Sequence, residues 1–528
     1  MLETRASDSG HSLSTILPLF FVSGPPIRER AFTGRLLGKG RPGSTLGERA
    51  GYCPAMGSHK RRSEIRSLVG GHVKKRDFGR CRSLAPVVGT GHATGSKRGW
   101  KLTIRQVLAL LGAVPSLAIA QAIPSPSTNF PARVMQAETV FQLGSPGLQG
   151  PGAAILGAAM DGAQYVLVGE AHFSQEIPRF TVSLCHQMAR KGLRAMAVET
   201  GPEAVRLLNN DLRRSDRTSR LSAFMRAHPD AMAFQNNIAE SAMSADCARE
   251  AGDAFQLWGL DQEFFGASGF MLEEMAAAAQ GPAAKEAIAR LRELDRRSTA
   301  GAVSSGSPGK LLIYTIGDAQ MSAARTAIVK DGGSRALQLF DELAETRAIF
   351  LASSSGIGDP NGRRARLIKR TMSSYLRGVP ANSRVLVKFG DVHVAKGFNS
   401  LRQRDLGNFV TEYAEGRGAS SLHILVMGKE GSLGAYNGFG RQVKVEPYTP
   451  IADGDYPWFA SALAGRPRQA ASSDWILLDL RQLRDIPAQE IPAAWRQLVL
   501  RYDLVAIAPK LTPAFLAGVE GVASAVAQ

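Results

Sequence analysis

The chain has 528 residues, 44% of them hydrophobic, which is enough to bury a sizeable core. Its formal net charge is +18, but the first 105 residues hold 20 Lys and Arg against 6 Asp and Glu, so the other 423 residues carry only +4. Because the basic residues are concentrated in this leader, the rest of the chain gives no reason to expect nucleic acid as a partner.

The leader divides into two parts. Residues 1–96 contain Gly, Ser and Arg clusters without an apolar period, and predict a basic extension that is either disordered or upstream of the true translation start. Residues 97–120 have the pattern of a signal peptide, with a positive start, an apolar run over 107–117 and small residues at Ala118 and Ala120. The run is shorter than the ~20 residues of a membrane-spanning helix. We therefore expect an exported protein, periplasmic or secreted, without stable membrane insertion after cleavage.

A Pro- and Ser-rich stretch over residues 121–135 predicts a linker, followed by a single domain over residues 136–528. Two of the four cysteines, Cys185 and Cys247, lie in this domain. In an oxidising compartment they could form one disulfide, although two buried free thiols fit the sequence equally well.

Strand and helix patterns alternate along this domain. Apolar, β-branched runs at 165–168 and 194–198 predict two strands with an amphipathic helix between them. A right-handed crossover makes such strands parallel, so their carboxyl ends meet at one edge of the sheet. Residues 203–380 show helical spacing and predict a helical insertion, interrupted by a strand at 255–261. Further strands are predicted at 385–389, 422–426, 475–480 and 504–508, and a surface loop at 429–458.

These elements predict an α/β fold with a mixed, mainly parallel sheet flanked by helices. The helical insertion falls between two strands that end in the same short motif of Gly, an acid, one further residue and His. The motif reads Gly-Glu-Ala-His over residues 169–172 and Gly-Asp-Val-His over residues 390–393. Two other predicted strands also end in an acid, Glu199 and Asp261. Because the carboxyl ends of parallel strands present side chains to ligands, we predict that this edge holds an active site.

Imidazoles and carboxylates gathered at one edge allow two mechanisms. In the first, a divalent ion such as Zn, Mn or Co lowers the pKa of a bound water, and Glu170 acts outside the ligands as general base. The ligands would come from His172, His393, Glu199, Asp261 and Asp391. In the second, His172, oriented by a carboxylate, deprotonates water directly, while His393 or an arginine stabilises the oxyanion. The sequence leaves both open, and it shows neither a serine nucleophile elbow nor a phosphate-binding glycine loop.

At these residues the chain resembles the superfamily that joins erythromycin esterases, the haem-binding lipoprotein ChaN, and the TraB, GumN and Tiki proteins. The resemblance rests on both Gly-acid-x-His motifs, on Glu199 and on the Trp-Gly-Leu-Asp run that ends at Asp261. In TraB and Tiki proteins paired Gly-x-x-His motifs and a glutamate form the catalytic or metal-binding set, which implies His172, Glu199 and His393 here.

The erythromycin esterases also carry an arginine on the helix before the last histidine, which matches Arg364 or, with a register shift of two residues, Arg366. Their first motif usually has two residues between Glu and His, where this chain has only Ala171. The resemblance therefore implies an exported hydrolase of an ester or amide, acting on a small-molecule or peptide substrate with His172, Glu170, Glu199, His393 and Arg364 as catalytic residues. The alternative that it implies is a periplasmic haem- or metal-binding protein of the ChaN type, without turnover.

Overall fold

The computed structural model describes residues 129–144, 147–450, 456, 458–463 and 473–520, which fall within one compact unit of the chain. The predicted basic extension, the predicted signal peptide and residues 121–128 of the predicted linker lie outside the described residues. The remainder of the predicted linker is wrong, because helix α2 (Phe130–Gln136) occupies it. Asn129 caps this helix, and the helix buries Phe130 and Val134 in the core.

Nine strands of the described residues form one sheet, in the order β2-β1-β10-β11-β7-β3-β6-β4-β5. The six strands from β11 to β5 run parallel, and the other three continue the sheet antiparallel at one edge. The predicted mixed, mainly parallel sheet is therefore confirmed, with β1 and β2 as strands that the sequence patterns missed. The bounds are β1 (Glu138–Gly144), β2 (Gly147–Gln149), β3 (Tyr165–Glu170), β4 (Leu193–Val198), β5 (Gln256–Gly259), β6 (Arg384–Gly390), β7 (Ser421–Gly428), β10 (Trp475–Asp479) and β11 (Leu504–Ala508).

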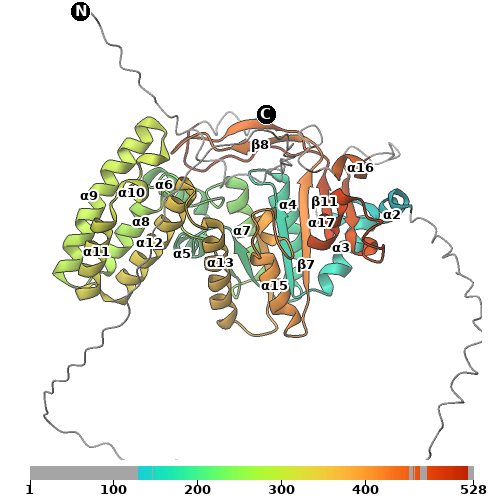
Figure 1. Ribbon diagram of the computed structural model, residues 1–528, viewed down its shortest axis with the longest axis horizontal. Helices are drawn as coiled ribbons and strands as arrows, with labels where there is room; N and C mark the ends of the chain where they lie inside the picture. The colour runs from blue at the N-terminus through green and yellow to red at the C-terminus, as the bar shows by residue number, and fades with distance from the viewer. Residues whose placement is uncertain (1–128, 145–146, 451–455, 457, 464–472, 521–528) are drawn as a thin grey trace, which may run out of the picture. The chain divides into compact units, whose positions relative to one another are not determined.

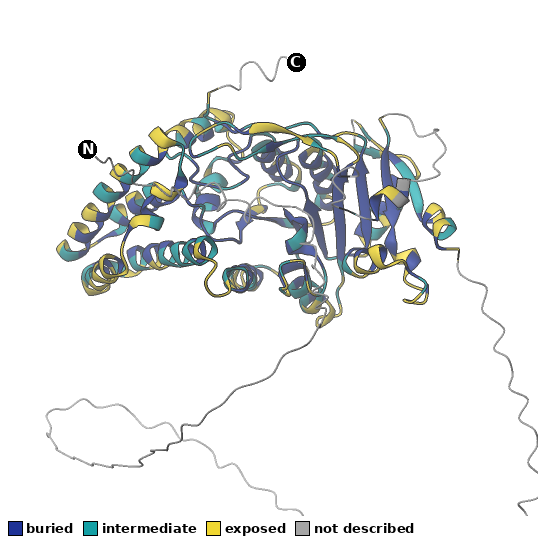
Figure 2. Ribbon diagram, turned by 45° about the horizontal axis from the view of Figure 1, so that its top comes forward, coloured by how far each residue is buried: buried dark blue, intermediate teal, exposed yellow. Residues whose placement is uncertain are grey.

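Helices cover both faces of the sheet, which explains why its central strands are nearly continuous apolar runs. All six residues of β3 are buried, and Figure 2 shows the strands dark blue between helices with exposed outer faces. One face packs against α2, α13 (Pro360–Arg377), α15 (Leu406–Glu415), α16 (Phe459–Leu463) and α17 (Ala493–Arg501). The other packs against α3 (Pro151–Asp161), α4 (Glu176–Ala189) and α7 (Ile238–Ala251). A disulfide between Cys185 and Cys247 joins α4 to α7, so the two cysteines are not free thiols.

The predicted helical insertion forms a layer with its own apolar core (Figure 1). In chain order it consists of α5 (Pro202–Asp211), α6 (Arg217–Ala227), α8 (Ser268–Ala278), α9 (Pro282–Ser305), the 3-10 turn η3 (Pro308–Lys310), α10 (Leu312–Thr315), α11 (Asp318–Asp331) and α12 (Gly333–Ser355). Strand β5 interrupts it, as predicted. None of the helices in the described part of the chain is long and apolar enough to cross a membrane.

Strand β5 forms an edge of the sheet, and α5 closes that edge. The side-chain amide of Asn209 accepts a hydrogen bond from the backbone N–H of Leu257 and donates one to its carbonyl, both at 2.9 Å. These are the backbone groups of Leu257 that a further strand would need, so Asn209 blocks pairing at this position of the edge.

The predicted surface loop over residues 429–458 is wrong in part. Strands β8 (Gly431–Ala435) and β9 (Lys444–Tyr448) form a separate antiparallel pair. Gly434 N–H donates to the carbonyl of Phe173, just beyond the carboxyl end of β3, and Ala514 N–H donates to the same carbonyl. The hairpin therefore lies over the carboxyl edge of the sheet, at the top of Figure 1.

Candidate active site

The strand register brings together the carboxyl ends of the four strands that the predicted acids end or follow. Glu170 ends β3 beside Gly390 of β6, and Val198 of β4 lies beside Lys388, so Glu199 follows directly beside the second motif. Asp261 follows β5 at the next position along the edge. All four acids and both histidines of the prediction meet at the carboxyl edge of the parallel strands, where such folds place their sites.

Glu199 lies between the two motif histidines. Its Oε2 is 3.6 Å from Nε2 of His172, and its Oε1 is 3.5 Å from Nε2 of His393. Arg364 donates to Oε1 of Glu199 at 2.5 Å, and the backbone N–H of Gly390 donates to Oε2 at 2.7 Å. One carboxylate thus connects both histidines and holds them about a shared centre.

The two motif glycines make this proximity possible. A Cβ on Gly390 would lie 2.8 Å from Nε2 of His172, and a Cβ on Gly169 would lie 2.6 Å from Cγ2 of Val394 in the short helix α14 (Asp391–Val394). Contacts under 3.0 Å force a shift of the neighbouring atoms. Each motif therefore needs a glycine because the other motif packs against it.

We call the first half of the site the His172 corner, formed by His172, Glu170, Lys388 and Glu240. Nδ1 of His172 lies 3.0 Å from Oε1 of Glu170. Nζ of Lys388, inside β6, lies 2.5 Å from that same oxygen and 2.5 Å from Oε1 of Glu240 on α7. All four side chains are buried, and Phe234 stacks on the imidazole of His172 with ring centroids 3.9 Å apart.

We call the second half the His393 corner, formed by His393, Asp405 and Asn399. Nδ1 of His393 lies 2.8 Å from Oδ2 of Asp405, which also accepts a hydrogen bond from the side-chain amide of Asn399. The other oxygen of Asp405 accepts from its neighbour's backbone N–H, that of Leu406, at 2.8 Å. This corner holds its histidine with one carboxylate and no lysine.

Charged neighbours keep Glu199 ionised despite its burial. Burial alone would raise the pKa of Glu199, but His393, Arg364 and His172 lower it to about 2, with help from the Gly390 N–H. Arg364 is buried and also donates to both oxygens of Asp261. Arg366, the other arginine that the resemblance allowed, is exposed and faces Asp359, so Arg364 is the residue at the site.

Both histidines hold a proton more tightly than a free imidazole does. Burial alone would lower the pKa of His172, but its contacts with Glu170 and Glu199 raise it above 6.5. Burial and Arg364 would lower the pKa of His393, but Glu199 and Asp405 raise it. In Glu170, burial alone would raise the pKa, and Lys388 and His172 lower it. Ionised Glu170 accepts the Nδ1 proton of His172, which leaves Nε2 facing the shared centre.

The remaining predicted residues, Asp261 and Asp391, lie close by, and Oδ1 of Asp391 is a buried acceptor without a hydrogen bond among the described residues. Asp261 is bound by Arg364 through both oxygens. Asp391 is buried, and its Oδ2 accepts a hydrogen bond from Tyr456 at 3.3 Å, while burial raises its pKa. Among the described residues, no three His, Cys, Asp or Glu side chains meet in a geometry that could hold a metal ion. Arg364 already engages both oxygens of Asp261 and one oxygen of Glu199, which leaves fewer of the predicted acceptors for a divalent ion.

An apolar cluster covers the site. We call it the cover cluster, and it comprises Phe173, Phe234, Val443 and Leu516 from four separate segments. Phe173 and Phe234 have φ angles of 63° and 57°, a left-handed backbone that is uncommon outside glycine and that occurs where structure is constrained for function. Phe234 of this cluster stacks on His172, whose exposed fraction is 9%.

Several residues of the site, Asn399 among them, were not predicted. Lys388 had a signal, because a lysine inside the apolar run of β6 is almost never buried without a partner. Glu240 and Asp405 lie in helix-starting segments, where an acid is common for local reasons. Phe234 lies between α6 and α7, and only the tertiary fold brings it to His172.

No protein-family model and no curated protein matches this chain. A solved structure of a histidine mutant of the erythromycin esterase EreC in its open conformation matches with 16% identity and a TM-score of 0.51, covering 71% of this chain and 98% of that one. The protein has the erythromycin esterase fold. A succinoglycan biosynthesis protein matches with 14% identity over 74% of this chain and 98% of its own, and a Bacillus cereus protein with 13% over 70% and 92%, both with a TM-score of 0.44.

The erythromycin esterase fold confirms the structural side of the predicted resemblance. At 16% identity it establishes the arrangement of strands and helices, and the chemistry has to be argued from this chain's own residues.

Proposed function

We propose that the protein is a metal-independent hydrolase in which His172 activates water for attack on an ester or amide. The observation that carries this proposal is the position of Glu199, whose two oxygens face Nε2 of His172 and Nε2 of His393. Two oriented imidazoles about one carboxylate supply a proton acceptor and a proton donor at a single centre, which hydrolysis requires.

In the proposed reaction, Nε2 of His172 takes a proton from the attacking water. Glu170 holds the ring by its Nδ1 proton and stabilises the imidazolium that forms, while Lys388 keeps Glu170 ionised. An ionised carboxylate that fixes the tautomer of a base in this way contributes orientation as well as charge.

On the opposite side, His393 serves as the proton donor. Its raised pKa favours the imidazolium form, and Asp405 fixes its Nδ1 so that Nε2–H points toward the shared centre. From there it stabilises the oxyanion of the tetrahedral intermediate and then protonates the leaving oxygen or nitrogen. Arg364 acts as a positioning residue that holds Glu199 in place.

We further propose that the protein works outside the cytoplasm. The Cys185–Cys247 disulfide supports this, since such bonds persist in oxidising compartments, and the signal-peptide pattern over residues 97–120 agrees with it. Amino-terminal sequencing of the exported protein tests the idea, which fails if residues before 97 are found in the mature product.

A screen of purified protein against carboxylic esters and peptides tests the hydrolase. The double variant His172→Ala/His393→Ala should lose turnover of every substrate that the native protein cleaves, because both proton-transfer groups are gone. His186→Ala is the matched control, since His186 lies on the surface of α4 and pairs with Glu250 away from the site. Full activity in the double variant would discard the site assignment. A haem titration in parallel identifies the carrier alternative by a change in visible absorbance.

A further inference from the structure

A cavity of about 650 Å³ lies beside the active site, along the edge strand β5. Helices α12 and α13 form its walls, and residues of β5 and of the segment after β5 form its floor. Asp261 lines one end and at the same time binds Arg364, whereas His172, Glu199 and His393 do not line the cavity. The volume suits one small molecule, and Asn209 leaves no room for an added strand at Leu257.

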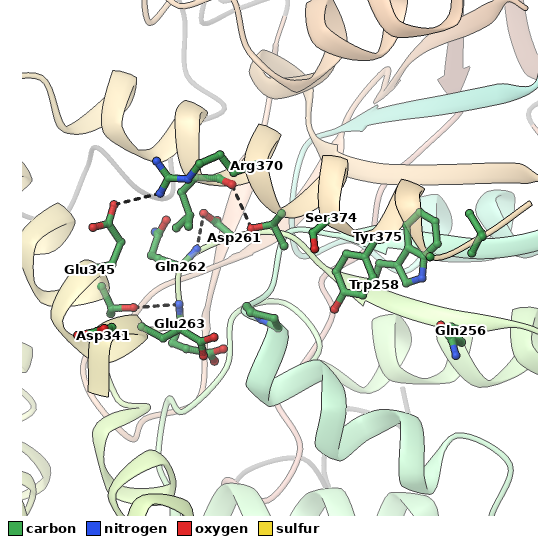
Figure 3. A pocket seen from close by; sticks show the side chains of 17 residues that line it. Gln256, Trp258, Asp261, Gln262, Glu263, Asp341, Glu345, Arg370, Ser374 and Tyr375 are labelled. Carbon is green, nitrogen blue, oxygen red and sulfur yellow. Dashed lines mark hydrogen bonds and ion pairs between the residues drawn. The ribbon is translucent and has the colours of Figure 1, made fainter. Parts of the chain in front are cut away.

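One side of the cavity, where β5 meets α13, is aromatic. Trp258 and Tyr375 stack with ring centroids 5.0 Å apart and an angle of 8° between the rings. Figure 3 shows this pair on one side of the cavity, with Glu345, Asp341 and Glu263 on the other. Flat aromatic faces bind apolar groups and attract cations through the ring quadrupole.

Carboxylates dominate the charged lining, and they differ in whether a cation already neutralises them. Asp261 pairs with Arg364, Asp341 with Arg325, and Glu345 with Arg363 and Arg370. Glu263 and Glu342 form no ion pair among the described residues. Glu263 instead accepts hydrogen bonds from the backbone N–H groups of Glu203 and Ala204 at the start of α5.

Two further acceptors on the lining have no donor. Oε1 of Gln262 and Oε2 of Glu342 are buried atoms that receive no hydrogen bond within the described part of the chain, and Gln262 is only 8% exposed. Buried polar atoms are nearly always hydrogen-bonded, so unpaired ones on a cavity wall indicate a ligand that supplies donors. An ammonium group supplies N–H donors and a positive charge together.

We propose that this cavity binds a small organic cation, an ammonium group carried on an apolar or aromatic body. The ammonium donates to Oε2 of Glu342 and Oε1 of Gln262, and the body packs on the Trp258–Tyr375 pair. The site is independent of the proposed hydrolysis, because none of these four residues contacts the histidines' shared centre.

The charge state of Glu342 and of Glu263, the two lining carboxyl groups without an ion pair among the described residues, supports the proposal. Burial raises the pKa of Glu263 to about 8 and that of Glu342 to about 7, so near neutral pH Glu263 is mostly protonated and Glu342 is about half protonated. A bound cation favours the ionised carboxylates and lowers both pKa values. Binding at pH 7 should therefore release protons, which a neutral ligand would not cause.

Isothermal titration calorimetry of the purified full chain tests the site with 4-phenylbutylamine and its neutral analogue 4-phenylbutan-1-ol. At pH 7 the amine should bind with a dissociation constant between about 10 μM and about 1 mM, and the alcohol at least about tenfold more weakly. Titrations in buffers of different ionisation enthalpy should show proton release with the amine alone. Equal affinities, no proton release, or no saturable heat at about 10 mM amine would overturn the proposal.

Three variants locate the binding. Glu342→Gln keeps the side-chain shape and should weaken the amine about tenfold while leaving the alcohol unchanged. Ser374→Trp, at an exposed position of the lining, should block both ligands without disturbing the core. Glu412→Gln, exposed on α15 and absent from the lining, should change neither affinity. Amine binding that survives Ser374→Trp would place the ligand elsewhere and contradict the proposal.

Discussion

The His172 corner and the His393 corner both orient a histidine toward Glu199, but they do so with different charged groups. Each holds the Nδ1 of its histidine against a carboxylate and directs Nε2 toward Glu199. In the His172 corner that carboxylate is shared with a buried lysine, which in turn reaches a second carboxylate, Glu240. In the His393 corner Asp405 is fixed by neutral donors, an amide side chain and a backbone N–H.

This difference bears on which histidine acts as the base. Burial raises the pKa of Glu240 to about 7, so the His172 corner contains a second group that can titrate as His172 gains and loses charge. The carboxylate of the His393 corner has no such partner. A base starts neutral and gains a positive charge when it takes a proton, whereas the donor starts charged and loses that charge only when it protonates the leaving group. We therefore assign the base to His172.

The largest expected effect comes from the residue that both corners share. Glu199→Gln keeps the shape of the side chain but removes the charge that raises the pKa of both histidines, and we expect kcat/KM to fall by about 10³ or more. Steady-state kinetics on any cleaved substrate measures this fall in kcat/KM. Glu412→Gln, the same substitution at an exposed position, is the control. A loss below about threefold would show that Glu199 is not central to catalysis.

The buried lysine of the His172 corner allows a stability test of the difference between the two corners. Lys388→Met leaves Glu170 and Glu240 without their cation, and should lower the free energy of unfolding by about 3–5 kcal/mol. Lys191→Met is the matched control, because Lys191 pairs with Asp161 at the surface and should contribute less than about 1 kcal/mol. Urea titrations measure both. Equal losses in the two variants would mean that the charges of the His172 corner are not buried together.

The pH dependence distinguishes the base from the donor. His172 must be neutral to act as base and its pKa is raised, so kcat/KM should rise with pH through a midpoint above 6.5. Glu170→Gln removes a hydrogen bond that raises this pKa and should move the midpoint to lower pH by about one unit. Asp405→Asn should leave the midpoint of that limb in place. The reverse pattern would assign the base to His393.

The same pKa shifts set the pH dependence of stability. Because the pKa of each histidine is raised in the folded state, its contribution to stability is complete below pH 6.5 and is lost as the pH rises through the raised value. Glu199 works in the opposite direction, since its pKa is lowered to about 2: its contribution is present above pH 4.5 and is lost as the pH falls toward 2.

The smallest effect concerns access to His172. Phe234→Ala removes the ring that stacks on His172, so carbethoxylation of His172 by diethyl pyrocarbonate should become a few-fold faster in peptide mass spectrometry. Phe398→Ala, at a phenylalanine that is 61% exposed, is the control. An unchanged rate at His172 would show that Phe234 does not limit access.

The parts of the fold that could be predicted are those whose pattern is local. Strands such as β3 and β6 are continuous β-branched runs because both their faces are buried, and the handedness of the crossover then places Glu199 beside His172. Strands β8 and β9 could not be predicted, because the glycines of β8, and Pro447 and the exposed side chains of β9, give them no apolar alternation. Only their contact with the loop after β3 makes them part of the site.

The residues of the site likewise divide into those that a local pattern predicts and those that only the tertiary fold brings in. The motif glycines and histidines were visible because they repeat, but their partners Glu240 and Asp405 lie on segments whose sequence carries no trace of the contact. The predicted metal mechanism followed from donor types alone. Sequence does not show that Arg364 engages both oxygens of Asp261 and one of Glu199, which leaves fewer acceptor oxygens for an ion.

Hydrolysis by metal-free protein tests the central claim most directly. Protein treated with chelator, and shown by elemental analysis to lack Zn, Mn and Co, should keep full turnover of its ester or amide substrate, while His172→Gln prepared in the same way should lose it. Activity that disappears on chelation and returns with one added metal, or that survives in His172→Gln, would contradict water activation by this histidine.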